Sequence, residues 1–139
     1  MAAKRVKMPH GGDESIEPGA VFVIRDATDV ERDEAPNSLT CIWGGGFRVY
    51  PAEPLVDLIE KFSALKLARL TSPGGMAMFI SAERVTDRDD RSTVQDHSNT
   101  RSVLLFGPGP GSPRVRVRET RADLIAIWEG LKLNTDPIV

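Results

Sequence analysis

The sequence contains little of what exported, membrane or metal-dependent proteins usually display. Its 139 residues include one cysteine, Cys41, so no internal disulfide can form and a reducing cytoplasm is the expected setting. No run approaches the roughly 18–20 apolar residues of a membrane span. The basic start leads into a polar segment, which differs from the apolar core of a secretion signal. We therefore expect a cytoplasmic protein without a membrane partner.

Residues suited to catalysis or metal binding are equally sparse. His10 and His97 lie far apart, and neither has metal-ligand spacing to Cys41. The glycine loops at 44–46 and 107–113 precede expected strands, whereas a phosphate-binding loop opens onto a helix. No strained turn frames a serine, and no carboxylate pair lies in apolar surroundings. The sequence thus predicts no catalytic residue, no metal and no cofactor, and an enzyme of unknown class remains only as an alternative.

Two helices are the clearest elements. Residues 54–65 place apolar side chains on one helical face, and Pro54 suits the first turn, where a missing N–H costs nothing. The second helix begins at Thr120 and ends at Asn134. Thr120 and Asp123 have the spacing of a capping box.

The sequence around these helices recurs 66 positions later. The matching pairs are Arg48-Val49 with Arg114-Val115, Glu53 with Glu119, and Asp57-Leu58-Ile59 with Asp123-Leu124-Ile125. With insertions, residues 40–44 resemble 103–107, and residues 21–24 resemble 77–80.

We predict an α+β fold that is a tandem duplication. Each copy is a small antiparallel sheet of three to four strands followed by one helix, and the two copies are packed together. The copies cover residues 3–65 and 67–133, and residues 134–139 form a short tail. The alternative is an ordinary α+β domain in which two similar runs arose by accident.

The second copy resembles the FlbD-like flagellar proteins and, more distantly, the RemA-like matrix regulators, both families of small bacterial regulators. The resemblance rests on Leu70-Thr71 before Gly75, Phe79-Ile80-Ser81 before Val85, the apolar strand 103–107, and the helix entry Val117-Arg118-Glu119-Thr120. It covers about half the chain, and the first copy only through the repeat. The resemblance implies a non-enzymatic regulator that acts through DNA or protein contacts.

An arginine strand is the sharpest surface feature. Alternation along a strand would direct Arg114, Arg116 and Arg118 to one face and Val115 and Val117 to the core. Arginines in such a row bind phosphates or carboxylates through paired hydrogen bonds. They could equally pair with the acids of residues 87–91. Arg121 lies nearby, and Arg48 and Tyr50 occupy the matching positions of the first copy.

Three functions remain open from the sequence. The first is an interaction protein that docks on a protein partner through a sheet edge, a loop or the arginine strand, as a regulator, an inhibitor or a mobile-element product. The second is a DNA-binding regulator that uses residues 114–118. The third is an enzyme. The polar segments 10–19 and 90–101 are further candidate recognition loops, and a homodimer is compatible with free strand edges.

Overall fold

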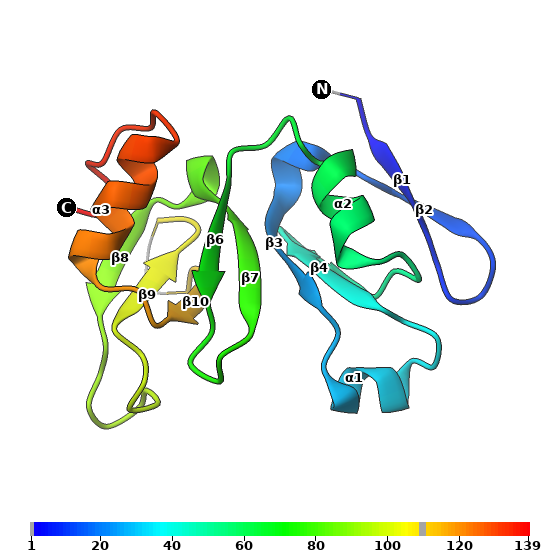
Figure 1. Cartoon of the computed structure of the whole chain (residues 1–139), viewed down its shortest axis with the longest axis horizontal. Coiled ribbons are helices and arrows are strands. Elements are labelled where there is room, and N and C mark those ends of the chain that lie inside the picture. Colours follow the sequence, from blue (N-terminus) through cyan, green and yellow to red (C-terminus); the bar gives the residue numbers. More distant parts are fainter. Residues whose placement is uncertain (1, 109–110) are drawn as a thin grey trace. The chain divides into compact units, whose positions relative to one another are not determined.

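The structure is a computed structural model that describes residues 2–108 and 111–139. It confirms the α+β fold class, since it combines antiparallel sheets with helices. The chain divides into two compact units, unit 1 (Met1–Leu65) and unit 2 (Lys66–Val139), which Figure 1 shows in blue to green and in green to red.

Five strands in the described part of unit 1 form a hairpin and a three-stranded meander. β1 pairs with β2, and β4 lies between β3 and β5. The elements are β1 (Lys4–Lys7), β2 (Asp13–Ile16), the 3-10 turn η1 (Pro18–Ala20), β3 (Val21–Asp26), α1 (Asp29–Glu34), β4 (Thr40–Gly44), β5 (Phe47–Val49) and α2 (Leu55–Lys61).

The described part of unit 2 repeats this order without a counterpart of α1. β6 pairs with β7, and β9 lies between β8 and β10. The elements are β6 (Leu67–Thr71), β7 (Ala77–Ser81), η2 (Ala82–Arg84), β8 (Asp87–Asp90), β9 (Ser102–Leu105), β10 (Arg114–Val117) and α3 (Arg121–Gly130).

Each unit contains the same kind of hydrogen-bond framework at the entry of its last helix. The Glu53 carboxylate accepts the Lys7 amide at 2.8 Å, and the Glu119 carboxylate accepts the Thr71 amide at 2.9 Å. The hydroxyl groups of Thr40 and Ser102 donate to the carbonyls of these same glutamates, at 2.9 and 2.8 Å. In both units the framework ties the first hairpin to the helix entry.

The first hairpin also turns in the same way in both units. The amides of Met8 and Ser72 donate across the turn to Gly12 and Met76, each at 2.8 Å. Gly11 and Gly75 follow with φ of +94° and +98°, a conformation that favours glycine.

Each unit has buried apolar side chains from both its sheets and its last helix. In unit 1 Ile24, Ile42, Leu58 and Phe62 are almost fully buried, and in unit 2 Leu70, Leu104, Leu124, Trp128 and Ile138 are. Ile138 lies in the expected tail, so the last residues pack on unit 2. Cys41 is buried too, and burial raises the pKa of its thiol.

The strand-level alignment of the two copies was wrong by one strand. The sequence matched residues 21–24 with 77–80, but β3 follows η1 while Ala77–Ser81 (β7) precedes η2. The counterpart of β7 is therefore β2, and that of β3 is β8. Asp13–Ile16 and Asp87–Asp90 are polar strands without apolar alternation, and for this reason each unit also has more strands than expected.

The helices differ from expectation mainly at their ends. α2 ends at Lys61 and α3 at Gly130, both earlier than predicted. The capping box of Thr120 and Asp123 is confirmed. α1 was not predicted, although Thr28 and Glu31 form the same kind of box. Within residues 2–108 and 111–139, no helix has the length and apolar character needed to cross a bilayer.

Candidate functional site

The arginine strand has the orientation that alternation predicts. In β10 Val115 and Val117 are buried, whereas Arg114 and Arg116 are exposed. Register pairs Arg116 with Val103 of β9, and Val103 in turn with Asp89 of β8. An acidic strand and a basic strand thus flank a central apolar strand on the same sheet face.

Each arginine of this row has a partner within unit 2. Arg114 Nη1 lies 3.5 Å from Asp89 Oδ2, and Arg116 Nε donates to Asp96 Oδ1. Arg118 donates from Nε and Nη2 to the Pro73 carbonyl, at 3.1 and 2.8 Å. The expected pairing with an acid of residues 87–91 therefore exists at Arg114, while Arg116 uses Asp96, a loop residue that the sequence did not single out.

A polar pocket of about 340 Å³ lies between these charged groups. Its lining consists of Asp89, Asp90, Ser92, Gln95, Asp96, Val103, Arg114 and Arg116. The side chains of Arg114 and Arg116 remain 37% and 43% exposed. The pocket thus presents both signs of charge to solvent.

Asp96 connects the loop after β8 to strand β10 through its carboxylate. Its Oδ2 accepts the Ser92 amide at 2.6 Å while its Oδ1 accepts Arg116. The hydrogen bond from Arg116 is the main reason why the pKa of Asp96 is lowered. Asp96 thus joins the loop after β8 to β10.

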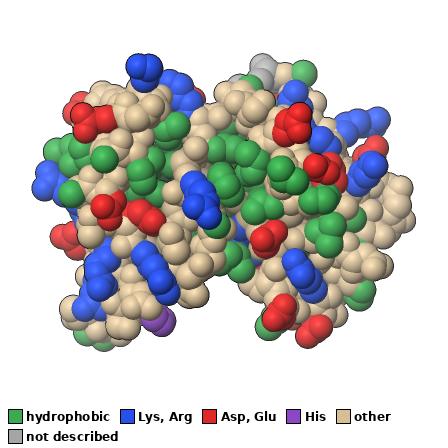
Figure 2. All heavy atoms as spheres, viewed as in Figure 1, with side chains coloured by type: hydrophobic (Ala, Val, Ile, Leu, Met, Phe, Trp, Pro, Cys, Tyr) green, Lys and Arg blue, Asp and Glu red, His purple; other side chains and the backbone are tan. Residues whose placement is uncertain are grey.

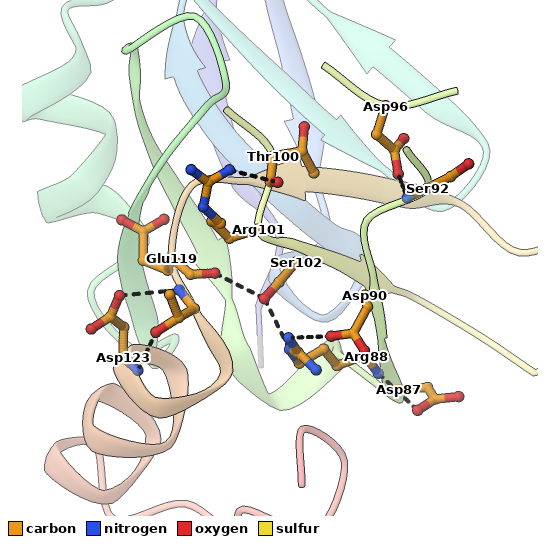
Figure 3. A network of polar contacts seen from close by, with 11 residues as sticks. Asp87, Arg88, Asp90, Ser92, Asp96, Thr100, Arg101, Ser102, Glu119 and Asp123 are labelled. Carbon is orange, nitrogen blue, oxygen red and sulfur yellow. Dashed lines mark hydrogen bonds and ion pairs between the residues drawn. The ribbon is translucent and has the colours of Figure 1, made fainter. Parts of the chain in front are cut away.

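A second polar network links β8 to β9 and to the helix entry, and it shares Asp90 with the pocket. Figure 3 shows Arg88 between Ser102 and Asp90, and Ser102 beside Glu119. Arg88 Nε donates to Ser102 Oγ at 2.9 Å, and Ser102 Oγ donates to the Glu119 carbonyl at 2.8 Å. Because the Arg88 side chain is only 9% exposed, this network joins β8, β9 and the helix entry and leaves little for a ligand.

The remaining predicted site residues are not gathered around the arginine pocket. Arg121 is exposed at the first position of α3 and forms no hydrogen bond or ion pair with the described residues. Arg48 and Tyr50 belong to unit 1. Arg48 Cζ lies 5.5 Å from the Trp43 ring centroid, within cation–π range, and burial raises the pKa of Tyr50.

Unit 1 contains a groove that the sequence did not reveal. It has a volume of about 300 Å³ and is lined by Glu14, Ser15, Ile16, Glu17, Ala20, Phe47 and Val49. Phe47 and Val49 lie two apart on β5, so their half-buried side chains share one face. In Figure 2 hydrophobic side chains gather among charged ones on the visible face of unit 1.

The backbone of β2 borders this groove with a free edge. Among the described strands β2 pairs only with β1, and the Met8 amide donates to the Gly12 carbonyl at the turn. In an antiparallel hairpin, residue pairs that exchange backbone hydrogen bonds alternate with pairs that do not. Because Met8 and Gly12 are bonded, Val6–Glu14 is also a bonded pair, whereas Arg5–Ser15 is not. The Ser15 N–H and C=O therefore point away from β1. Lys7 of β1 shows the same alternation on the edge of β1 that faces away from β2. There its N–H donates to the Glu53 carboxylate, and its C=O accepts the Ala52 amide.

Among the described residues, no group of three or more His, Cys, Asp or Glu side chains has a geometry that could hold a metal ion. Comparison with models of known protein families, with curated proteins and with solved structures finds no match for this chain.

Proposed function

We propose that the protein is a non-enzymatic interaction module that binds an extended segment of a protein partner at the β2 edge of unit 1. The observation that carries this proposal is the combination, in one place, of unpaired strand backbone and an apolar groove floor. In strand addition, the main-chain hydrogen bonds supply affinity and the pockets for alternate side chains supply specificity. By occupying a partner's strand in the cytoplasm, such a module can regulate or inhibit it.

The edge has the features that strand addition requires. Ser15 presents one N–H and one C=O outward, and it also lines the groove. Ile16, Phe47 and Val49 provide the apolar surface beside it. Soluble proteins usually cover or interrupt an edge of this kind, since it is a template for another strand.

Selection from a random peptide library against the intact protein tests the proposal. Ser15→Pro removes the outward N–H without removing a bond between β1 and β2, and edge strands tolerate proline at such positions. Ser15→Ala keeps the N–H and is the matched control. Ala20→Arg fills the groove from η1 and serves as a second blocking variant.

We expect the selected peptides to bind the wild type and Ser15→Ala equally, and Ser15→Pro and Ala20→Arg at least about tenfold more weakly. That loss corresponds to about 1.4 kcal/mol, which is the size of one net hydrogen bond. Peptides that bind all four proteins alike, or a library that yields no binder, would contradict the proposal. Circular dichroism spectra of the variants verify that they remain folded.

Binding of duplex DNA by β10 is the second candidate. The partial exposure of Arg114 and Arg116, together with the unpartnered Arg121, favours it. The carboxylates of Asp89, Asp90 and Asp96 line the same pocket and repel phosphates. The groove in unit 1 therefore supports protein binding better than the arginine strand supports DNA binding.

A further inference from the structure

The groove of unit 1 has an acidic rim, and the charge of this rim restricts which ligands the groove can bind. Glu14 lies on β2, Glu17 follows it directly, and both line the groove. Both residues are exposed. Neither side chain forms an ion pair or hydrogen bond with a residue that the structure describes. Neither carboxylate is therefore engaged in a described contact, although Lys4, Arg5 and Lys7 lie on the neighbouring strand β1.

The floor of the groove has the opposite character. Ile16 is 4% exposed, and the half-buried Phe47 and Val49 complete an apolar surface with Ala20. Glu14 and Glu17 line the groove together with these residues. Apolar floor and acidic rim thus occur within one binding site.

Resting on the function proposed above, we infer that the occupant is an extended segment in which apolar residues alternate with lysine or arginine. A strand that bonds to Ser15 directs successive side chains to opposite faces. One set lies on the face of Ile16, where it contacts Phe47 and Val49 beside Glu14, and the other set lies on the face of Ser15, toward Glu17. An acidic segment of the same shape would place like charges side by side, which disfavours it.

Three synthetic peptides of equal length separate the contributions. The first alternates lysine and valine, the second alternates glutamate and valine, and the third alternates lysine and serine. Each carries a fluorophore, and its binding to the intact protein is measured by fluorescence anisotropy at low and moderate salt. We expect only the lysine–valine peptide to bind, and its affinity to fall as salt rises.

Charge reversal of the rim provides the matched comparison. In Glu14→Lys/Glu17→Lys, the lysine–valine peptide should bind about 2–30-fold more weakly at low salt, as two exposed ion pairs are each worth ~0.2–1 kcal/mol. The glutamate–valine peptide should gain affinity. Glu34→Lys/Glu60→Lys makes the same change in net charge on α1 and α2 and should leave both affinities unchanged.

The outcomes distinguish this inference from the proposed function. Equal binding of both valine peptides would overturn the basic preference and leave strand addition standing. Binding of the lysine–serine peptide as tight as that of the lysine–valine peptide would show plain charge attraction and overturn the inference. No binding of either valine peptide would overturn both proposals. Self-association in light scattering that Glu14→Lys/Glu17→Lys abolishes would identify a second copy as the occupant and overturn the inference as well.

Discussion

At the scale of the residue, the arginine strand shows what a local pattern can and cannot specify. Alternation correctly predicted that Val115 and Val117 are buried while Arg114 and Arg116 are exposed. The pattern could not identify Asp96 as the partner of Arg116, because the two residues meet through a loop of no regular periodicity. The polar segment 10–19 was named as a candidate recognition loop, but the strand β2 within it and the groove beside it were not predicted, because Asp13–Ile16 has no apolar alternation.

The ion pair of Arg25 and Glu31 makes a pH prediction at this scale. Arg25 Nη1 and Nη2 bind both oxygens of the carboxylate, at 2.7 and 2.9 Å, and these bonds are the main reason why the pKa of Glu31 falls from 4.5 to about 2. A lowered folded-state pKa contributes stability above pH 4.5, and this contribution is lost as the pH falls toward 2.

We therefore expect Glu31→Gln to lower the free energy of unfolding by about 2 kcal/mol at pH 7, discounted for partial exposure, and the difference from wild type to shrink below pH 4.5. Urea unfolding followed by circular dichroism between pH 2.5 and 7 measures this. Glu34→Gln, an exposed neighbour on α1, should track the wild type. A constant difference across the range would rule out the ion pair as the source.

At the scale of the element, capping residues proved more informative than hydrophobic periodicity. The box of Thr120 and Asp123 located the start of α3 correctly. Periodicity extended both predicted helices too far, because apolar residues after Lys61 and Gly130 pack in turns that follow the helices. The box of Thr28 and Glu31 would have revealed α1, but its six residues bury none of their side chains and so carry no apolar stripe.

The glutamate before each final helix should stabilise its unit more than its position in a loop suggests. Glu53 accepts the Lys7 amide and the Lys61 ammonium; burial alone would raise its pKa, yet these bonds outweigh burial and lower it. Within the described part of the chain, the Glu119 carboxylate accepts a single hydrogen bond, from the Thr71 amide. Each removal leaves a backbone N–H without its partner.

We expect Glu119→Ala to reduce the free energy of unfolding by about 1–3 kcal/mol and Glu53→Ala to reduce it by a larger amount, because Lys61 also loses its carboxylate partner and keeps only the Arg5 carbonyl among its described contacts. Urea unfolding compares them with Glu129→Ala, an exposed residue of α3 without a described side-chain contact. Destabilisation no greater than that of Glu129→Ala would mean that the shared framework contributes nothing to stability.

At the scale of the whole molecule, the duplication could be recognised in the sequence only where the two copies have the same residues. Glu53 and Glu119 match in sequence and also in their bonds to the first hairpin. Lys7 and Thr71 occupy equivalent places without any similarity, since the framework uses only their backbone amides. A repeat held by backbone geometry can thus persist where side chains differ. The polar strands β2 and β8 were not recognised from sequence, and the apolar strands β3 and β7 were therefore aligned with each other.

The charge of the whole chain limits what the arginine strand can do with DNA. The net charge is −2, and Asp89, Asp90 and Asp96 stand beside Arg114 and Arg116. Arg118 already binds the Pro73 carbonyl. Arginine side chains at four positions of the predicted site (Arg114, Arg116, Arg118 and Arg121) could contact at most about four phosphates. The logarithm of the affinity for DNA should therefore fall with a slope of roughly −3 to −4 against the logarithm of salt concentration.

We accordingly expect labelled duplex to show a weak mobility shift at about 50 mM salt that disappears by about 200 mM. Arg116→Ala should weaken the shift and reduce the slope by about one, whereas Arg69→Ala, a basic residue outside the pocket, serves as the matched control. Asp89→Asn should strengthen binding, because it removes a repelling charge beside Arg114. Tight binding that persists at 200 mM salt and depends on Arg116 would instead establish DNA as the ligand of this face. The function of the groove in unit 1 would then be tested only by the peptide-binding experiments.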